Sequence, residues 1–377
     1  MTIETLNYIN KQWQINENIL DRNTIDIVFI FGDSEDIKQV EAYESLREIY
    51  GDAHIVGCSS SGNILGDELS NASIVGTAIS FKTSNVQVAV KDFSSSNDQE
   101  NISKELIEEL PKENLKHIFL LSDGLNMNGS LLVKGANAAV SSKIPITGGL
   151  AGDGMDFKET WVVANDVAKQ NRLVAIGFYG DDLVSSSGCY AGWEEFGIYR
   201  HITKSSGNIV YEIDGKPALD LYKKYLGEYA NKLPSSGLKF PFNVKEQKDS
   251  KAVIRSVLAI DEEAKSLIFA GDIQEGSYAR LMKSDIDGLI DGSAEAASDI
   301  NKHNKSDALG LVVSCVGRRV VLNQLTEEEL EVISDTLGVN VQLTGFYSYG
   351  ELAPHSNELL SCQLHNQTMT LTVIYED

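Results

Sequence analysis

A unit of strand, helix and strand recurs three times along this chain, and the recurrence constrains the fold more than any other feature of the sequence. The units start with the apolar runs IDIVFIFGD (25–33), KHIFLLSDG (116–124) and LGLVVSCVGRR (309–319). A helical stretch follows each run and leads to a second one, which ends in HIVGCSSSG, PITGGLAGDG and VQLTGFYSYGE, respectively. In the first two units, 24 residues separate Asp33 from Gly57 and 25 separate Asp123 from Gly148. This near-equal spacing indicates duplication of one supersecondary unit.

Further β-rich runs close each unit. SIVGTAISF and VQVAV flank the turn residues Lys82–Asn85 in the first unit, RLVAIGFYG and LVSSSG follow in the second, and HNQTMTLTVIYED takes this place in the third. We expect the paired runs to form hairpins. Strands that alternate with helices and hairpins predict an α/β fold with two layered domains, in which mixed sheets are built from repeated β-α-β-hairpin units.

The third unit has the best-marked helix, within QLTEEELEVISDTLG. Thr326 and Glu329 have the spacing of a capping box, in which each side chain bonds the backbone N–H of the other residue. Leu330, Ile333 and Leu337 fall on one face of this helix. We therefore expect Glu329 to stabilise the helix N-terminus.

The stretch between the second and third units, residues 188–251, differs from the repeats in its sequence pattern. It contains a Trp-Glu-Glu-Phe segment, a strand-like NIVYEIDGKP and a loop LPSSGLKFPF. We place a domain boundary near residue 205, within KSSGN. This predicts a leader segment of residues 1–24, followed by domains of residues 25–205 and 206–377.

The charge of the chain excludes several classes of partner. A net charge of −23 repels phosphate backbones and anionic lipid head groups, so we expect no nucleic acid partner. No run approaches the roughly 18 apolar residues of a membrane span, and the polar N-terminus lacks the pattern of a signal peptide. The four cysteines form no CxxC pair. These features predict a cytoplasmic protein without membrane insertion.

The loop GCSSSG (57–62) at the end of a strand is a candidate for ligand binding. Its backbone amides are suited to an anionic group, with Cys58, Ser59 and Ser60 facing the ligand. Alternatively, Cys58 is a nucleophile, although the motif is neither a Walker loop nor G-x-S-x-G. A small buried cysteine is the commoner structural alternative.

The loop GGLAGDG (148–154) is a second candidate at a strand end. Its glycine pattern differs from the dinucleotide pattern G-x-G-x-x-G, and no amphipathic helix opens behind it. Gly149 could approach a ligand closely, and Asp153 could orient a ligand amine. The structural alternative is a tight turn that needs glycine at positive φ, with Asp153 as its cap.

The third unit offers charged and aromatic candidates. Arg318 and Arg319 could bind a ligand carboxylate with two parallel hydrogen bonds, or form structural ion pairs in this acidic chain. In GFYSYGELAPHS, Tyr347, Tyr349 and Glu351 suit a ligand cation or a stacking surface. Alternatively, the tyrosines pack on one strand face and Glu351 pairs with one of the arginines.

The last strand opens with three adjacent polar side chains, His365, Asn366 and Gln367, which a simple core strand does not need. They either cap the strand or belong to a site. The six histidines, His355 among them, show no closely spaced metal pattern. No catalytic triad or carboxylate pair can be assembled from sequence spacing.

Several of these stretches together resemble the FIST family. The motifs that carry the resemblance are IVGCSSSG and GGLAGDG in the first half, and FAGDIQEGS, SCVGRR, GFYSYGELAP and HNQTMTLT in the second. The C-terminal set is the more specific. The resemblance covers residues 25–377 and implies an N-terminal and a C-terminal FIST domain.

This resemblance implies a sensory protein for signal transduction. FIST domains are thought to bind small molecules such as amino acids and to act with a histidine kinase, or with a diguanylate cyclase or phosphodiesterase. One branch of bacterial members consists of haem-binding sensors of nitric oxide, for which His365 or His355 would be the axial ligand here. No output domain is apparent in the sequence, so we expect a separate partner.

We therefore expect a cytoplasmic sensor with a small-ligand pocket where the strand-end loops converge, and the seam between the domains as its moving part. The pocket is predicted to contain Cys58, Ser59, Ser60, Gly149, Asp153, Arg318, Arg319, Tyr347, Tyr349, Glu351, His365 and Asn366. A haem-based nitric oxide sensor is the first alternative. An enzyme that uses Cys58 is the second, and no motif supplies it with a base and an oxyanion hole.

Overall fold

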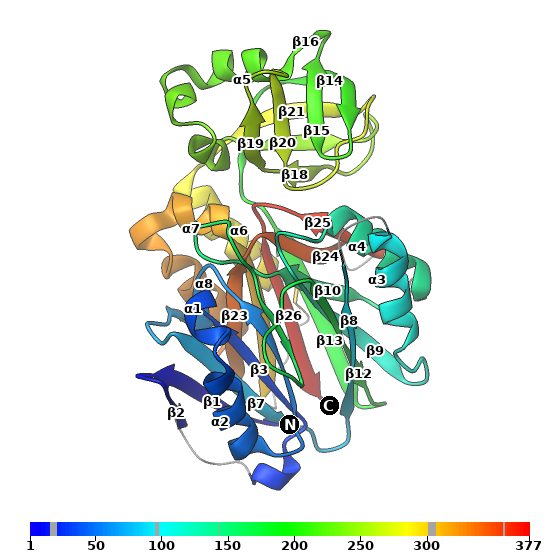
Figure 1. Ribbon diagram of the computed structural model, residues 1–377, viewed down its shortest axis with the longest axis vertical. Helices are drawn as coiled ribbons and strands as arrows, with labels where there is room; N and C mark the ends of the chain where they lie inside the picture. Colours follow the sequence, from blue (N-terminus) through cyan, green and yellow to red (C-terminus); the bar gives the residue numbers. More distant parts are fainter. Residues whose placement is uncertain (16–20, 95–97, 142, 301–306, 357–358) are drawn as a thin grey trace.

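The chain folds into a body of three six-stranded sheets and a smaller lobe that holds a fourth sheet (Figure 1). The computed structural model describes residues 1–15, 21–94, 98–141, 143–300, 307–356 and 359–377. In Figure 1 the lobe lies at one end of the long axis, and both termini lie in the body away from it. The α/β class with mixed sheets is confirmed.

Each sheet of the body is centred on one sequence unit. The two apolar runs of a unit form neighbouring parallel strands joined through a helix, and a third strand lies antiparallel on the other side of the first. These elements are β3 (Ile27–Gly32), α1 (Ser34–Ile37), α2 (Val40–Tyr50), β4 (His54–Ser59) and β7 (Ile74–Ser80) in the first unit; β9 (Leu115–Ser122), α4 (Gly129–Ala139), β10 (Ile146–Leu150) and β12 (Arg172–Tyr179) in the second; and β22 (Ala308–Cys315), α7 (Val316–Leu322), α8 (Glu328–Leu337), β23 (Val341–Ser348) and β26 (Met369–Glu376) in the third.

Most of the other strands of the body join the sheet of a unit other than the one they follow in sequence, whereas β1 and β2 extend the sheet of the first unit. On one side of the sheets, β5 (Asn63–Leu65) pairs with β23, β11 (Val162–Ala164) with β4, and β24 (Gly350–Ser356) with β10. On the other side, β1 (Thr2–Ile9) pairs with β7, β8 (Asn85–Asp92) with β12, and β13 (Leu183–Tyr190) with β26. The strands β2 (Gln12–Ile15), β6 (Glu68–Leu69) and β25 (Leu359–His365) extend the three sheets at one edge each, and β11, β8 and β13 form the opposite edges.

This exchange differs from the expected hairpins. The runs that flank Lys82–Asn85 are β7 and β8, and they lie in different sheets. Because each unit satisfies the backbone hydrogen bonds along an edge of another unit's sheet, the three units form one interlocked body.

Glycine at one repeated position lets the parallel strands approach closely. A Cβ atom added to Gly57, Gly148 or Gly345 would lie 1.8, 2.0 or 1.9 Å, respectively, from the carbonyl oxygen of the opposite residue on the preceding strand. Only glycine fits at such a distance. The same requirement in all three units is structural support for the duplication.

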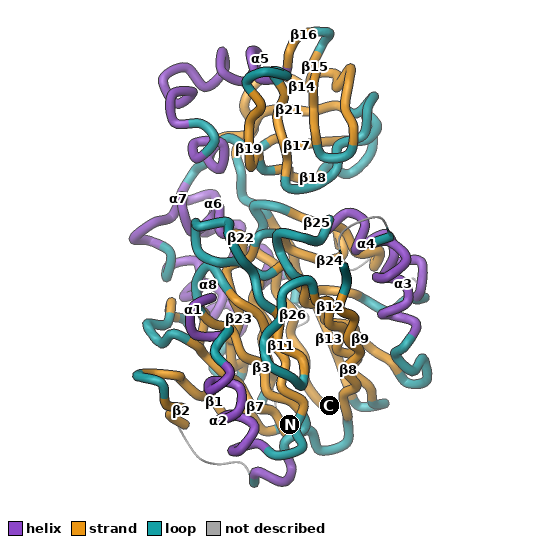
Figure 2. Tube along the Cα trace, viewed as in Figure 1, coloured by secondary structure: helices purple, strands orange, loops and turns teal. Residues whose placement is uncertain are grey.

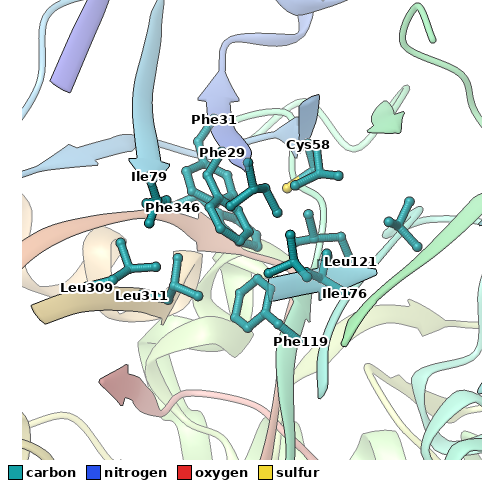
Figure 3. Packing of buried hydrophobic residues seen from close by; sticks show 14 of the residues in the cluster. Phe29, Phe31, Cys58, Ile79, Phe119, Leu121, Ile176, Leu309, Leu311 and Phe346 are labelled. Atoms are coloured by element: carbon teal, nitrogen blue, oxygen red, sulfur yellow. The ribbon is translucent and has the colours of Figure 1, made fainter. Parts of the chain in front are cut away.

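The main core lies where the three sheets face one another (Figure 3). Phe31 of the first unit stacks on Phe346 of the third at 4.9 Å, and Phe29 contacts Phe119 of the second edge-on at 6.0 Å. Helices cover the outer faces (Figure 2). They include α3 (Gln99–Glu108), which packs on α4, and α6 (Ile286–Ser298), which packs on α8.

The lobe comprises residues 194–283 and has a core of its own. Its strands are β14 (Glu194–Ser206), β15 (Ile209–Ile213), β16 (Lys216–Pro217), β17 (Phe242–Lys245), β18 (Val253–Arg255), β19 (Val257–Asp261), β20 (Ser266–Phe269) and β21 (Tyr278–Lys283), with α5 (Ala218–Leu226) beside them. The chain enters the lobe before β14 and leaves it after β21. The domain boundary predicted near residue 205 stays a prediction. In the structure, residue 205 lies within β14, inside the lobe.

The helix start in the third unit was predicted wrongly. The helix α8 begins at Glu328, and its N-cap residue Glu327 makes no side-chain cap bond. The hydroxyl of Thr326 donates instead to the carbonyl oxygen of Asn323 at 2.6 Å. Glu329 is fully buried and is used elsewhere, as described below.

Candidate functional site

The strand-end loops that were predicted to converge do lie together, at the centre of the body. Each donates a backbone N–H to a carbonyl oxygen of another unit, which closes a ring of three hydrogen bonds. The bonds join Ser61 to Tyr347 (2.8 Å), Gly152 to Ser59 (3.0 Å) and Tyr349 to Leu150 (3.1 Å). Carboxyl ends of strands in α/β sheets commonly bind ligands.

Three of the predicted residues, Ser60, Asp153 and Arg319, line one cavity of about 700 Å³, which we call the strand-end cavity. It lies at the ends of β3 and β4, beside the loop after β10 and the start of α7. The other charged side chains that line it are Asp33, Glu35, Asp156, Lys158 and Glu159. Because acidic residues outnumber basic ones, the cavity favours a ligand that carries a cationic group.

Arg319 is the main cationic group of this cavity. Its Nη1 donates to the carbonyl oxygen of Ser61, and the guanidinium lies 5.9 Å from the centroid of the Tyr347 ring. Arg319 forms no ion pair with a carboxylate of the described residues. Asp33 lies near enough that the arginine opposes the rise in pKa that burial causes for this carboxyl group. Donors of the Arg319 guanidinium are therefore available to a ligand anion.

The loop GCSSSG contributes to this cavity through its second half. The Ser60 hydroxyl accepts the N–H of Gly62 at 3.1 Å and donates to Asn63. Ser59 is buried and accepts the N–H of Trp161 at 2.9 Å. Cys58 lies in the central core, where burial raises the pKa of its thiol. A buried, protonated thiol favours the structural interpretation of Cys58 over a nucleophile.

Asp153 lines the strand-end cavity, but both of its carboxylate oxygens are engaged. They accept the N–H groups of Phe157 (2.9 Å), Lys158 (2.7 Å) and Glu159 (2.9 Å), and Oδ1 also accepts the hydroxyl of Tyr349. This favours the second interpretation of Asp153, in which it caps a turn. The bond to Tyr349 holds the loop of residues 151–160 against the junction between β23 and β24.

Arg318 lies in the interior and lines none of the cavities found among the described residues. Its guanidinium pairs with Glu329 at 2.8 Å, and both side chains are fully buried. It also donates to the carbonyl oxygens of Ala191 (2.6 Å) and Leu289 (2.7 Å). The Tyr347 hydroxyl donates to the same Glu329 at 2.6 Å. Arg318 and Tyr347 therefore belong to a buried polar network, which is the structural alternative stated for the arginine.

Glu351 is also buried, although it pairs with neither arginine. It accepts the hydroxyls of Ser348 (2.6 Å) and Thr368 (2.9 Å) and the N–H of Thr368 (3.2 Å). Burial raises its pKa to about 7 despite these hydrogen bonds. Gly149 is likewise internal, because a Cβ atom there would lie 2.6 Å from Val313.

The residues that open the last strand are internal too. His365 and Asn366 are 3% and 1% exposed, and neither lines a cavity among those found in the described part of the chain. Asn366 has no hydrogen-bond partner for its amide group there. Trp193 donates to the carbonyl oxygen of Gln367 at 2.9 Å, so this turn helps to anchor the segment that enters the lobe.

The two histidines proposed as haem ligands lie side by side, and the haem interpretation stays a prediction. His365 Nε2 contacts the carbonyl oxygen of Ala353 at 3.2 Å, and its ring packs edge-on against His355 at 5.3 Å. His355 lines a cavity of about 620 Å³ whose wall also carries the charged residues Lys134, Glu246, Lys251, Arg255 and Asp272. An apolar macrocycle is poorly matched to such a wall. The described residues contain no group of three or more metal-ligating side chains.

A further cavity, of about 320 Å³, lies between the body and the lobe, and we call it the inter-lobe cavity. Tyr349 is the one predicted site residue that lines it. Sequence reasoning missed its other walls, which include Asn126 and Phe157 from the body and Asn208 and Phe269 from the lobe. Phe269 opens the motif FAGDIQEGS, but its spacing to the other three gives no sign of a shared site, because these residues come together only when the lobe packs on the body.

Comparison with known proteins places the chain in a family. The FIST N domain model matches residues 26–216 and the FIST C domain model matches residues 218–354. The chain therefore belongs to the FIST family of sensory signal-transduction domains, as its motifs predicted. None of the helices in the described ranges is both long and apolar enough to cross a membrane.

Two individual similarities accompany this match. An uncharacterised protein of Methanocaldococcus jannaschii is 27% identical over 258 residues, which are 62% of this chain and 49% of that protein. The chain thus matches about half the length of this relative. A crystal structure of cyanuric acid hydrolase from A. caulinodans aligns with 95% of this chain and 91% of its own, at a TM-score of 0.37 and 9% identity. Similarity at that level carries no argument about fold or activity.

Proposed function

We propose that this protein is a cytoplasmic sensor that binds a small zwitterion, such as an amino acid, in the strand-end cavity. Arg319 carries the proposal. It lies in a cavity of about 700 Å³, donates to a single described acceptor, the carbonyl oxygen of Ser61, and forms no described ion pair. An arginine fork in this position is suited to a ligand carboxylate.

The acidic side chains of the same cavity supply the complementary half of the site. Asp33 and Glu35 lie at its edge, and the Asp33 carboxylate has one long described hydrogen bond, from Asn63 at 3.4 Å. The Asp33 carboxylate can therefore take a ligand amine, whereas Glu35 already pairs with Lys38 at 3.0 Å. Asp153 is excluded from that role because its oxygens hold the loop of residues 151–160. A zwitterion offers a counter-charge to Arg319 and to Asp33 at the same time.

The position of the cavity suits signalling. Its walls come from all three units, through β3 and β4, the loop after β10, and α7. A ligand changes a protein only by binding one arrangement more tightly than another. Ligand contacts to three units favour the arrangement in which those units lie closest. A histidine kinase, or a diguanylate cyclase or phosphodiesterase, is the proposed partner, and membership of the FIST family supports this part of the proposal.

Calorimetric titration of the purified full chain with the twenty amino acids tests the proposal. For the tightest ligand, the methyl ester removes the carboxylate charge and the N-acetyl derivative removes the amine charge. We expect both changes, and Arg319→Gln, to weaken binding at least about ten-fold, since each removes a charged hydrogen bond.

Arg200→Gln is the matched control, because Arg200 lies in the lobe and pairs with Asp214 at 2.7 Å. It should leave the affinity unchanged. Binding that survives Arg319→Gln, or that is equally tight for the methyl ester, would refute the assignment of the carboxylate to Arg319. No binding by any amino acid would refute the ligand class.

A further inference from the structure

The inter-lobe cavity differs in chemistry from the strand-end cavity. Eighteen residues line it, and none is Asp, Glu, Lys, Arg or His. Since 23% of the chain is charged, a random set of that size would include about four charged residues. A charged ligand would lose its hydration there without gaining a counter-ion, so the cavity selects against ions. An uncharged ligand meets no such cost.

One wall of the cavity is a stacked aromatic pair. Phe157 lies on Tyr349 with ring centroids 4.6 Å apart and planes inclined by 12°. Phe157 is 39% exposed, so the pair still presents an open aromatic surface beside the cavity. Offset rings at this separation are a favourable arrangement, and a further flat ring can extend it.

The loop conformation that presents Phe157 is unusual and is actively held. Phe157 has φ of +52°, a region that bulky side chains rarely adopt. The Asp153 carboxylate maintains it by accepting the N–H groups of Phe157, Lys158 and Glu159. Backbone strain of this kind persists where surrounding contacts impose it and concentrates at ligand sites. Asp153 is therefore a positioning residue for the aromatic wall.

Unused polar atoms define the hydrogen bonds that a ligand can make. Ser256 accepts from Gln367 at 2.8 Å, so its own hydroxyl hydrogen is left to donate. The Nδ2 atoms of Asn208 and Asn126 donate to Phe269 (2.8 Å) and Asp123 (3.0 Å). The side-chain Oδ1 atoms of these two asparagines accept no hydrogen bond from the described residues. The walls thus offer at least one donor, the Ser256 hydroxyl, and at least two acceptors, the side-chain oxygens of the two asparagines.

We propose that the inter-lobe cavity is a second binding site, which takes an uncharged planar ring compound that bears both a hydrogen-bond donor and an acceptor. The ring stacks on the Phe157–Tyr349 pair, and its polar groups meet Ser256 and the two asparagines. Because the walls belong to both the body and the lobe, occupancy fixes their relative position. The loop of residues 151–160 contributes to the walls of both this site and the strand-end cavity.

Two matched pairs of probes test whether the inter-lobe cavity prefers uncharged ligands: nicotinamide against nicotinate, and benzamide against benzoate. Each pair keeps the ring and exchanges an uncharged amide for an anion. Ligand-observed NMR or calorimetry on the full chain, with probes up to 10 mM, measures the weak binding expected of such small compounds. We expect at least one amide to bind at least ten-fold more tightly than its acid partner. Failure of both amides to bind, or equal binding of the acids, would overturn the proposal.

Two variants locate the site. Phe157→Ala should weaken binding of the amide at least about ten-fold, as loss of a stacking ring does. Arg319→Gln should leave it unchanged, because Arg319 lines only the strand-end cavity. Amide binding that survives Phe157→Ala but is lost in Arg319→Gln would place the ring in the other cavity and overturn the assignment. Circular dichroism of both variants confirms that they are folded.

Discussion

Adjacent arginines with opposite roles give the sharpest prediction about this protein. Arg318 is fully buried against Glu329, whereas Arg319 is partly exposed in the strand-end cavity. We expect Arg318→Ala to destabilise the fold strongly and Arg319→Ala to affect ligand binding with little change in stability. The two substitutions are chemically identical and one position apart, so each serves as the control for the other.

The magnitude follows from the contacts of Arg318. Its removal leaves the Glu329 carboxylate buried without a cation, although Tyr347 (2.6 Å) and Ser314 (3.1 Å) still donate to it. The carbonyl oxygens of Ala191 and Leu289 lose their bonds to the guanidinium as well. Breaking a buried pair in this way costs about 3–5 kcal/mol. Arg319 keeps solvent contact, and its loss should cost less than about 1 kcal/mol.

Urea unfolding of the full chain, followed by tryptophan fluorescence and far-ultraviolet circular dichroism, measures both effects. If the lobe unfolds separately, the transition of the body is the one that Arg318→Ala should move. A loss below about 1 kcal/mol for Arg318→Ala, or equal losses for the two variants, would refute the argument that Arg318 is structural and Arg319 is available to a ligand.

Three further outcomes are expected. Burial raises the pKa of Glu351 to about 7, so the folded state keeps a proton that the unfolded chain releases near pH 4.5, and the resulting stabilisation is complete below pH 4.5 and is lost as the pH rises through 7. In urea unfolding, the stability of Glu351→Gln relative to the wild type should therefore rise by up to about 3 kcal/mol between pH 4.5 and 8. A difference that does not depend on pH would contradict this. Gly57→Ala places a methyl group 1.8 Å from a carbonyl oxygen and should lower the free energy of unfolding by about 3 kcal/mol or more. Gly66→Ala, with open space around it and φ of +68°, should lower it by only about 1 kcal/mol. Similar thermal midpoints for the two variants would count against the close approach at Gly57. Haem added to the purified protein should produce no Soret band that depends on a histidine, and a band lost in His355→Ala or His365→Ala would restore the haem interpretation.

Much of the fold follows from local patterns. The apolar runs, the intervening helices and the recurrence of both are periodic features, and periodicity depends only on near neighbours in the chain. The last strand illustrates this: Met369, Leu371 and Val373 pack in one core cluster, as the alternation predicts. Its threonines are buried too, because sheets and helices cover both faces, and alternation alone gives no signal for that.

Strand partners were not predictable in the same way. The two runs around Lys82–Asn85 look like a hairpin in sequence, but their hydrogen bonds go to strands of different sheets. A short turn permits a hairpin and does not require one. The choice depends on which sheet edge lies within reach once three units have packed together, and that is a property of the whole body.

The candidate site was likewise predictable only in part. Glycine-rich strand ends and their convergence followed from the repeated unit, because equivalent strands end at the same side of equivalent sheets. Burial decided the rest: Arg318, Tyr347, Glu351 and His365 are polar residues in suggestive motifs, yet each lies in the interior. A sequence records that a side chain is polar and does not record whether its partner will be a ligand or another residue.

The sequence by itself therefore determined the repeated α/β unit and the family, since these depend on residue types and their spacing. Only the tertiary structure decided which strands the units exchange, which of two adjacent arginines reaches a cavity, and that an uncharged cavity lies between the body and the lobe. These features depend on contacts between residues far apart in the chain, and the local sequence does not specify such contacts.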